Sequence, residues 1–171
     1  MNDFSSSDSA RFAAIYQREH SDVLRFIARR LNPPDLARAE DVAHETFLVA
    51  WRRLTEIPVN LNEARAWLFT VARNCLLNEL RKGSKRAQLN VRIADTAADA
   101  AAFSEPDAIG AKLDLTAAWN RLDAGDQEVI ALNYWDGLSS AEAAKVLGIT
   151  GPNYRIKLHR ARNNLKKLLE G

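Results

Sequence analysis

The chain has 171 residues, enough for one ordinary domain or for two small helical domains joined by a linker. Hydrophobic residues make up 47% and charged residues 27%, a mix typical of a soluble globular protein and not of a disordered one. No apolar run approaches the ~20 residues that span a bilayer, and the first ten residues lack the layout of a signal peptide, so we expect a cytoplasmic protein without membrane insertion.

The first half of the chain predicts two amphipathic helices before residue 55. Ser9 is expected to cap the first helix, and Pro33 and Pro34 to end it, because proline lacks the N–H that a helix interior needs. The second helix is predicted over residues 35–54, with its own apolar stripe.

A loop over residues 55–61 precedes a third predicted helix, which runs from Asn62, as its N-cap, to about residue 82. Trp67 has the spacing of a core residue, which favours packing in the core over a role as an exposed stacking platform. Cys75 is the single cysteine and lies in an apolar stretch, so we interpret it as a buried structural thiol.

Helical periodicity is lost after residue 83. The segment up to residue 110 is rich in alanine and contains Pro106, and its residues 95–107 carry four acidic and no basic side chains. It is typical of a linker, which we assign to residues 86–110. The sequence therefore predicts an all-α protein of two small domains, residues 1–85 and 111–171, joined by a flexible acidic linker.

The second domain contains a predicted helix-turn-helix. Two helices, over residues 111–122 and about 129–135, come first, and Gly137 is expected to adopt a left-handed C-cap. Ser139 and Glu142 then form a capping box that opens a short helix, and Gly148 allows the sharp turn that follows it.

The last helix, residues 151–169, is basic on one face. Its apolar residues at i, i+4, i+7 and i+11 are expected to face inward: Tyr154, Leu158, Ala161 and Leu165. This leaves six other side chains exposed: Asn153, Arg155, Ile156, Lys157, His159 and Arg160. A solvated helical hairpin is the simpler alternative, but positive charge clustered on one helix favours DNA binding.

At this point the sequence resembles a known family. Residues 138–150, with Arg155 and residues 158–162, are similar to region 4 of the extracytoplasmic-function sigma factors of bacteria. Residues 39–47 resemble the region 2.2 signature of that family, and Trp67-Leu68 with residues 71–74 resemble its region 2.4. The resemblance covers both predicted domains, in the family's order.

The resemblance implies a protein that binds core RNA polymerase and directs promoter-specific initiation of transcription, without catalytic activity, metal or cofactor. Its expected partners are the clamp helices of the largest polymerase subunit, the flap of the second subunit, promoter DNA and an anti-sigma factor. The acidic linker would follow the path of nucleic acid inside the polymerase; a merely solubilising tether would look similar.

The resemblance also implies site residues in the first domain. Asp41 and Glu45, one helical turn apart, would pair with polymerase arginines, and Phe47 would be an exposed aromatic anchor. The alternative is a solvated acidic face with Phe47 in the core. The minus-ten element, held as single-stranded DNA, would be bound by amides and cations: Asn60, Asn62, Arg65, Arg73, Asn74, Arg81 and Lys82.

The basic helix would bind the minus-thirty-five element as duplex DNA. Arg155, Lys157 and Arg160 would contact phosphates or guanines, Asn153 an adenine edge and Ile156 a thymine methyl group, with His159 on the same face. The start of this helix departs from the family pattern at residues 152–154 and at Ile156, which leaves its preferred DNA sequence open.

Two other classes of protein share single features of this sequence. His44-Glu45 resembles the start of a zinc-peptidase helix, but the histidine due four residues after His44 is Leu48, which weighs against an enzyme. A stand-alone helix-turn-helix regulator would use the same basic helix without polymerase, but it would not explain the region 2 resemblance.

Overall fold

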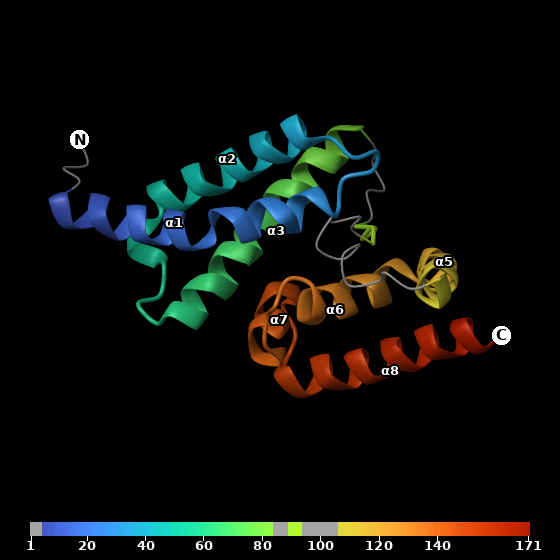
Figure 1. Ribbon diagram of the computed structural model, residues 1–171. Coiled ribbons are helices and arrows are strands. Elements are labelled where there is room, and N and C mark those ends of the chain that lie inside the picture. The colour runs from blue at the N-terminus through green and yellow to red at the C-terminus, as the bar shows by residue number, and fades with distance from the viewer. Residues whose placement is uncertain (1–4, 84–88, 94–105) are drawn as a thin grey trace.

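A computed structural model describes residues 5–83, 89–93 and 106–171, and all the regular structure in these ranges is helical (Figure 1). The N-terminal part contains three α-helices and one 3-10 turn: α1 (Ser6–Ala28), α2 (Leu36–Arg52), η1 (Leu54–Glu56) and α3 (Leu61–Gly83). The C-terminal part contains four: α5 (Pro106–Arg121), α6 (Ala124–Tyr134), α7 (Ser140–Leu147) and α8 (Gly151–Glu170). The all-α fold expected from the sequence is confirmed.

The N-terminal helices pack on one another around a continuous apolar core. Phe26 of α1 and Phe69 of α3 are both fully buried and meet edge to face, with ring centroids 5.1 Å apart. Burying one such side chain stabilises a fold by about 1.5–3 kcal/mol. The three helices therefore form a bundle, in which α2 and α3 have their polar faces outward.

Two helix starts differ from the sequence-based prediction. Ser5, not Ser9, caps α1, because its hydroxyl accepts from the amide of Asp8 while the Asp8 carboxylate accepts from the amide of Ser5. This capping box satisfies two backbone donors at once. Ser9 could not form such a box, because the residue three positions after it is not acidic. Likewise, Asn60 and not Asn62 caps α3, as described below.

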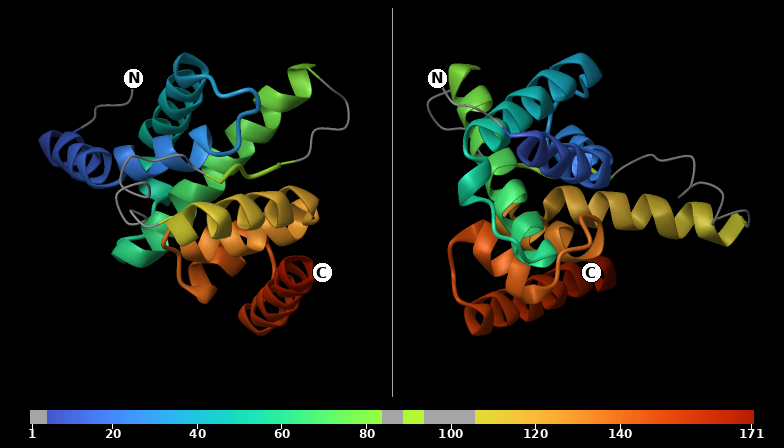
Figure 2. Two further views of the ribbon diagram at one scale, coloured as in Figure 1. Left: turned by 45° about the vertical axis from the view of Figure 1, so that its right-hand side comes forward. Right: turned by 90° about the vertical axis from the view of Figure 1, so that its left-hand side faces the viewer.

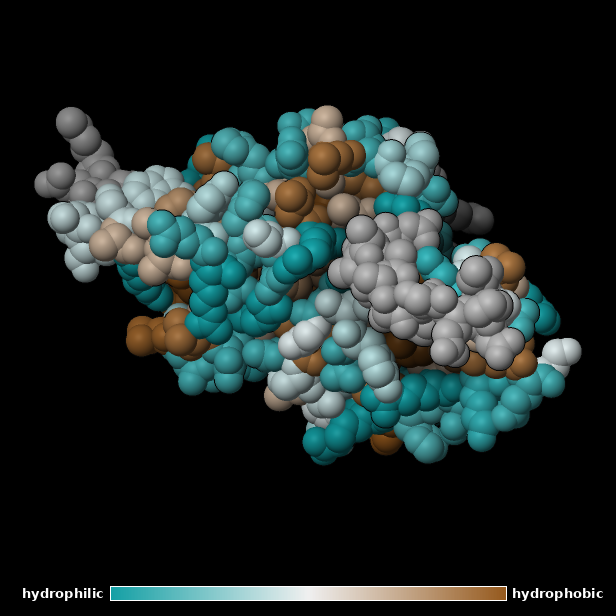
Figure 3. Space-filling model, in the orientation of Figure 1, coloured by the Kyte–Doolittle hydropathy of each residue, from teal (hydrophilic) through white to brown (hydrophobic). Residues whose placement is uncertain are grey.

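The C-terminal helices form a second bundle, in which α8 packs against α5, α6 and α7. Figure 3 shows α8 along the lower edge of the molecule as an almost continuous hydrophilic surface. Helix α5 begins at Pro106, earlier than the expected linker boundary, because proline is well tolerated in the first turn of a helix. Three of the four acidic residues of the expected linker, Asp95, Asp99 and Glu105, lie outside the described residues.

Residues 89–93 are packed between the two bundles. The amide of Val91 donates to Gln127 of α6, and its carbonyl accepts from the indole of Trp119 in α5. On the other side, the Arg92 guanidinium donates to two carbonyls at the end of α1, at 2.8 and 2.9 Å. This part of the expected linker is therefore bonded to both domains.

The two bundles also touch directly, since α7 packs on α3 and α6 lies nearby (Figure 2). Within the described ranges, no helix is both long and apolar enough to cross a membrane.

Candidate nucleic-acid interface

The helix-turn-helix of α7 and α8 forms by local rules visible in the sequence. The Ser139–Glu142 capping box opens α7, as expected. Gly148 ends it with φ +67°, a left-handed conformation that glycine adopts without strain. Thr150 then caps α8 by accepting from the amide of Asn153. The sharp turn sets α8 across α7 with one face outward.

The inward face of α8 is fixed by Tyr154, which is fully buried. Its hydroxyl donates to the carbonyl of Val129 in α6 at 2.6 Å. Burial raises the pKa of Tyr154 to about 12, because the phenolate would lose its hydration there. Leu158 and Ala161 are buried beside it, so the predicted inward face is confirmed at these positions.

The outward face of α8 consists of exposed side chains that we call the recognition face: Asn153, Arg155, Ile156, Lys157, His159 and Arg160. Ile156 is exposed although it is apolar. Among the described residues, Arg155, Lys157 and Arg160 have no carboxylate partner. Three cations and an apolar group on one open surface match what the major groove offers, namely phosphates, guanine edges and thymine methyl groups.

On α2, Asp41 and Glu45 are exposed on one face, one turn apart, as expected. The expected exposure of Phe47 is wrong, since only 4% of this residue is accessible. Its ring packs edge to face against Phe12 and Tyr16 of α1, which lie on the inner side of α2. Thr46 to Phe47 therefore belong to the core, and the exposed apolar neighbour is Leu48.

The loop before α3 presents two asparagines with different roles. The side-chain oxygen of Asn60 accepts from the amides of Asn62 and Glu63, at 3.0 and 3.2 Å, and so caps α3. The side chain of Asn62 is exposed and does not cap the helix. An asparagine at N-cap satisfies helix donors that have no partner within the helix.

A cavity of about 310 Å³ opens beside the first half of α3. It is lined by residues of the loop, of α3 and of α7: Arg53, Pro58, Glu63, Trp67, Thr70, Val71, Asn74 and Lys145. Trp67 is half-buried and forms one wall, with the Arg53 guanidinium 5.7 Å from its ring centroid. Trp67 is therefore less buried than its spacing indicated, and Thr70 and Lys145 were not foreseen as members of this site.

The cations of α3 fall into two groups. Arg65 pairs with Glu19 and, at 3.0 Å, with Asp22, and its guanidinium donates to the carbonyl of Asp136 at 2.9 Å. Burial opposes the charge of Asp22, but hydrogen bonds from Arg25 and Arg65 outweigh it and lower the pKa of Asp22.

Arg73 forms a two-fold hydrogen bond with Glu128 of α6, at 2.6 and 3.1 Å, and this bond raises the pKa of Arg73. Arg81 and Lys82 lie near the end of α3, roughly 25 Å along the helix axis from Arg65 at 1.5 Å per residue. Both are exposed, and Lys82 pairs with Glu79. Of the expected minus-ten residues, Asn74 lines the cavity, whereas Arg65 and Arg73 are paired with acids of α1 and α6, and Arg81 and Lys82 lie apart near the end of α3.

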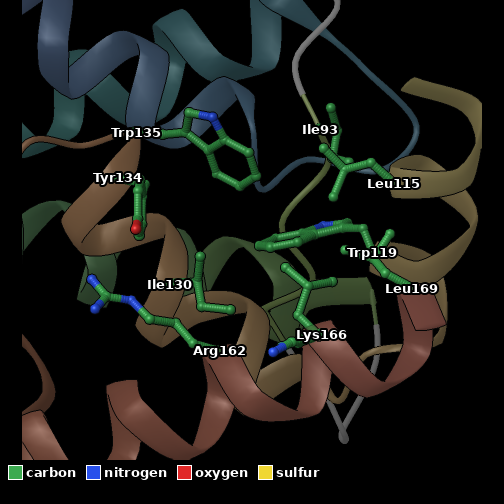
Figure 4. A pocket seen from close by; sticks show the side chains of 10 residues that line it. Ile93, Leu115, Trp119, Ile130, Tyr134, Trp135, Arg162, Lys166 and Leu169 are labelled. Atoms are coloured by element: carbon green, nitrogen blue, oxygen red, sulfur yellow. The ribbon is translucent and has the colours of Figure 1, made fainter. Parts of the chain in front are cut away.

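A second cavity, of about 350 Å³, lies between α5, α6 and α8 (Figure 4). Its walls are mostly apolar and aromatic: Ile93, Leu115, Trp119, Ile130, Tyr134, Trp135, Arg162, Leu165, Lys166 and Leu169. Trp119 and Trp135 meet edge to face with centroids 4.7 Å apart, and Tyr134 is exposed beneath the Arg162 guanidinium. Sequence patterns assign all of these residues except Ile93 to helices, but they do not show that the side chains leave an apolar hollow.

Comparison with known proteins assigns both bundles. Residues 15–86 match the family model for sigma-70 region 2, and residues 112–165 match that for sigma-70 region 4. Over 168 residues the chain is 37% identical to the ECF RNA polymerase sigma factor SigL of Mycobacterium tuberculosis, covering 96% of this chain and 92% of that protein. It is 30% identical to SigM of Bacillus subtilis, covering 90% and 92%.

Two solved structures are similar to this chain over most of its length. Sigma factor RpoE of Bartonella quintana, in complex with the anti-sigma factor NepR, has a TM-score of 0.62 at 27% identity, covering 92% of this chain and 97% of that one. CnrH, in complex with the cytosolic domain of CnrY, has a TM-score of 0.60 at 27% identity, covering 93% and 87%.

Proposed function

The chain belongs to the ECF RNA polymerase sigma factors, which direct transcription initiation with core RNA polymerase, and from this membership we propose how its surfaces divide the work of promoter recognition. Residues 1–85 would act as region 2 on the minus-ten element, residues 111–171 as region 4 on the minus-thirty-five element, and residues 86–110 as the connection. A regulator that works without polymerase is not favoured, because it would leave the region 2 match unexplained.

The single observation that carries this proposal is the recognition face of α8, which is exposed over its whole length and basic. Arg155, Lys157 and Arg160 would contact phosphates or guanine edges, since guanidinium and ammonium groups are donors only. Asn153 would pair with an adenine edge and Ile156 with a thymine methyl group, with His159 at the rim of the same face.

The cavity beside α3 would hold a base of the opened minus-ten strand. Unpaired bases can enter a pocket that a duplex cannot reach, and there they meet hydrogen-bonding and aromatic groups. Asn74, Thr70 and Trp67 supply such groups here. Asn62 lies at the loop, and Asn60 would hold the loop in shape by capping α3. Arg65, Arg73, Arg81 and Lys82 would bind the phosphates.

Two surfaces would bind core polymerase. Asp41 and Glu45 of α2 would pair with basic residues on the clamp helices of the largest subunit, while Phe47 supports α2 from inside. The apolar cavity between α5, α6 and α8 would receive an apolar segment from the flap of the second subunit. Hollows lined by aromatic groups suit such an anchor, because its burial removes apolar surface from water.

Control by an anti-sigma factor is part of the same proposal, because two structurally similar relatives were solved with partner proteins, one of them named as an anti-sigma factor. We assign this chain no catalytic activity, metal or cofactor, and we place its action in the bacterial cytoplasm, where RNA polymerase works. These assignments follow from its family.

The test is transcription in a purified system. Transcripts mapped after overexpression supply the promoter fragments, and run-off transcription from one of them with core enzyme and this protein should give a defined product. The protein alone should bind the same fragment far more weakly than the protein with core enzyme. Equal binding with and without core enzyme, and no transcript, would favour a stand-alone regulator instead.

A further inference from the structure

Residues 89–93, which we call the strap, form a segment without regular secondary structure that is bonded to the C-terminal bundle. The amide of Val91 donates to the side-chain oxygen of Gln127 at 3.1 Å, and its carbonyl accepts from the indole of Trp119. Gln127 is itself fixed, because its amide group donates to the carbonyl of Trp119 at 2.8 Å. Both backbone groups of Val91 are therefore held by side chains of α5 and α6.

The strap reaches the apolar cavity between α5, α6 and α8. Ile93 forms part of the cavity wall together with Trp119, and Figure 4 shows the two side chains side by side. Val91 is only 2% accessible, whereas its neighbour Asn90 is exposed. The seat of the strap and the cavity thus form one continuous surface, which meets at Trp119.

The cavity by itself is small for the partner that the proposed function gives it. Its volume of about 350 Å³ is near the lower end of the ~300–1,000 Å³ of pockets that hold one small molecule. A stable interface between two proteins buries about 800 Å² on each partner. A polymerase segment anchored in the cavity therefore needs more surface, and the seat of the strap adjoins the cavity.

We propose that the strap and the flap of the second polymerase subunit compete for one surface. In the free protein the strap covers part of the surface that receives the apolar segment of the flap, and this segment displaces the strap when polymerase binds. The inference rests on the function proposed for the cavity between α5, α6 and α8. It makes the position of the linker part of the equilibrium of polymerase binding.

The strap can leave its seat while both bundles stay folded. On the side of the N-terminal bundle, the amide of Arg92 donates to the carbonyl of Arg29 at 2.8 Å. Its guanidinium donates to the carbonyls of Ala28 and Leu31. Carbonyls at the end of a helix lack partners within the helix, so water can replace Arg92 there. A short segment held by bonds of this kind opens at a lower free energy than a packed bundle.

The groups that the strap leaves behind define what the incoming segment must supply. The indole of Trp119 loses its acceptor and the side-chain oxygen of Gln127 loses a donor, and a buried polar group without a partner is costly. One peptide unit offers both a donor and an acceptor. We therefore expect the segment to present apolar side chains beside a free peptide group, as at a helix end or in a loop.

The test uses the full-length protein and a purified fragment of the second polymerase subunit that contains the flap. Val91→Ser and Ile93→Ser each remove an apolar side chain of the strap, and Asn90→Ser, at an exposed position of the same strap, is the matched control. Isothermal titration calorimetry measures the affinity of each protein for the flap fragment. Mass spectrometry follows hydrogen exchange of the strap amides in the wild type, with and without the fragment.

We expect Val91→Ser and Ile93→Ser to bind the flap fragment about tenfold more tightly than the wild type. Apparent affinity falls by the fraction of molecules whose surface is free, so a strap seated in about nine molecules of ten costs that factor. Asn90→Ser should bind as the wild type. The fragment should also speed up exchange of the amides of Val91 and Arg92, since both are hydrogen-bonded while the strap is seated.

Equal or weaker affinity in both strap variants would overturn the proposal, and so would strap amides that exchange no faster when the fragment is bound. Circular dichroism shows whether a variant keeps its helices, and the exchange experiment needs no variant at all. If the wild type binds the fragment while its strap stays seated, only the competition is refuted. A fragment that binds neither the wild type nor the variants would refute the flap site itself, and the competition with it.

Discussion

The two surfaces that face DNA differ in what surrounds their cations. On α8, Arg155, Lys157 and Arg160 stand on an exposed helix, and none of them pairs with an acid in the described part of the chain. On α3, Arg65 and Arg73 are tied to acceptors from α1 and α6. Both surfaces are basic in sequence, so positive charge alone does not tell whether a surface is open to nucleic acid. Whether a basic surface is open depends on the acidic side chains that pack next to it in the fold.

The largest expected effect concerns the buried ion pair that joins the two bundles, in which Asp136, just after α6, pairs with Arg30 and Arg29, just after α1. Arg30→Met leaves Asp136 buried with only Arg29 as partner, which should weaken docking of the two bundles by about 3–5 kcal/mol. Calorimetry should then show the bundles unfolding in two separate transitions. Arg38→Met is the control, because Arg38 pairs with Glu79 inside the N-terminal bundle and is 32% exposed. Identical profiles for both variants would contradict the expectation that the fully buried pair holds the bundles together and the partly exposed pair does not.

The second effect tests the open surface. Arg160→Ala should weaken binding of the polymerase complex to a promoter fragment by about 1–3 kcal/mol, because an exposed arginine contributes through DNA and not through folding. Circular dichroism should be unchanged. Arg121→Ala, at the exposed end of α5, is the control and should bind as the wild type. Unchanged affinity in Arg160→Ala would count against the recognition face.

A smaller effect concerns the support beneath that face. Tyr154→Phe removes the hydrogen bond to Val129 and should cost about 1 kcal/mol in the free energy of unfolding at neutral pH. Folded Tyr154 keeps its proton to a pKa of about 12, whereas the unfolded chain loses it near 10.0, so stability is fully present below pH 10 and falls as the pH rises from 10 towards 12. Urea unfolding of Tyr154→Phe across this range should lack that part of the decline.

The smallest effect separates charge from shape on α8. In Lys157→Gln, the affinity for duplex DNA should fall less steeply with salt. The slope of log affinity against log salt should be smaller in magnitude by about 0.9, because one fewer phosphate is neutralised. At any single salt concentration the affinity should change by less than about tenfold. A slope equal to that of the wild type would mean that Lys157 does not contact a phosphate.

Local rules in the sequence predicted most of the fold. The capping box at Ser139, the left-handed Gly148 and the inward Tyr154 each depend on residues within a few positions, and the structure confirms them. The structure places the cap of α1 at Ser5 and not at Ser9, because several serines occur there and only Ser5 is followed three positions later by an acid, Asp8. The resemblance favours an exposed anchor at Phe47, but its position on α2 is compatible with either face, and in the structure Phe47 lies in the core.

The candidate site was predictable only in part. Exposure of the recognition face follows from the period of α8, so the sequence is enough. The pair of Arg30 and Asp136 joins residues 106 positions apart, and no local pattern marks either one as a partner. The same holds for Lys145 at the cavity of α3 and for the hollow beside Trp119. The contacts of Arg30 and Lys145 arise from how the two bundles dock, and the hollow arises from how α5, α6 and α8 pack on one another.

Residues 89–93 bear on how proteins of this design can be recombined. Both backbone groups of Val91 are bonded to side chains of the C-terminal bundle, and Arg92 is bonded to the end of α1. A C-terminal half grafted from a relative would keep its contact with residues 89–93 only if it had an amide side chain at position 127 and an indole at position 119. The unit that can be transplanted intact is thus α5 to α8 together with residues 89–93, and not α8 with its preceding turn alone.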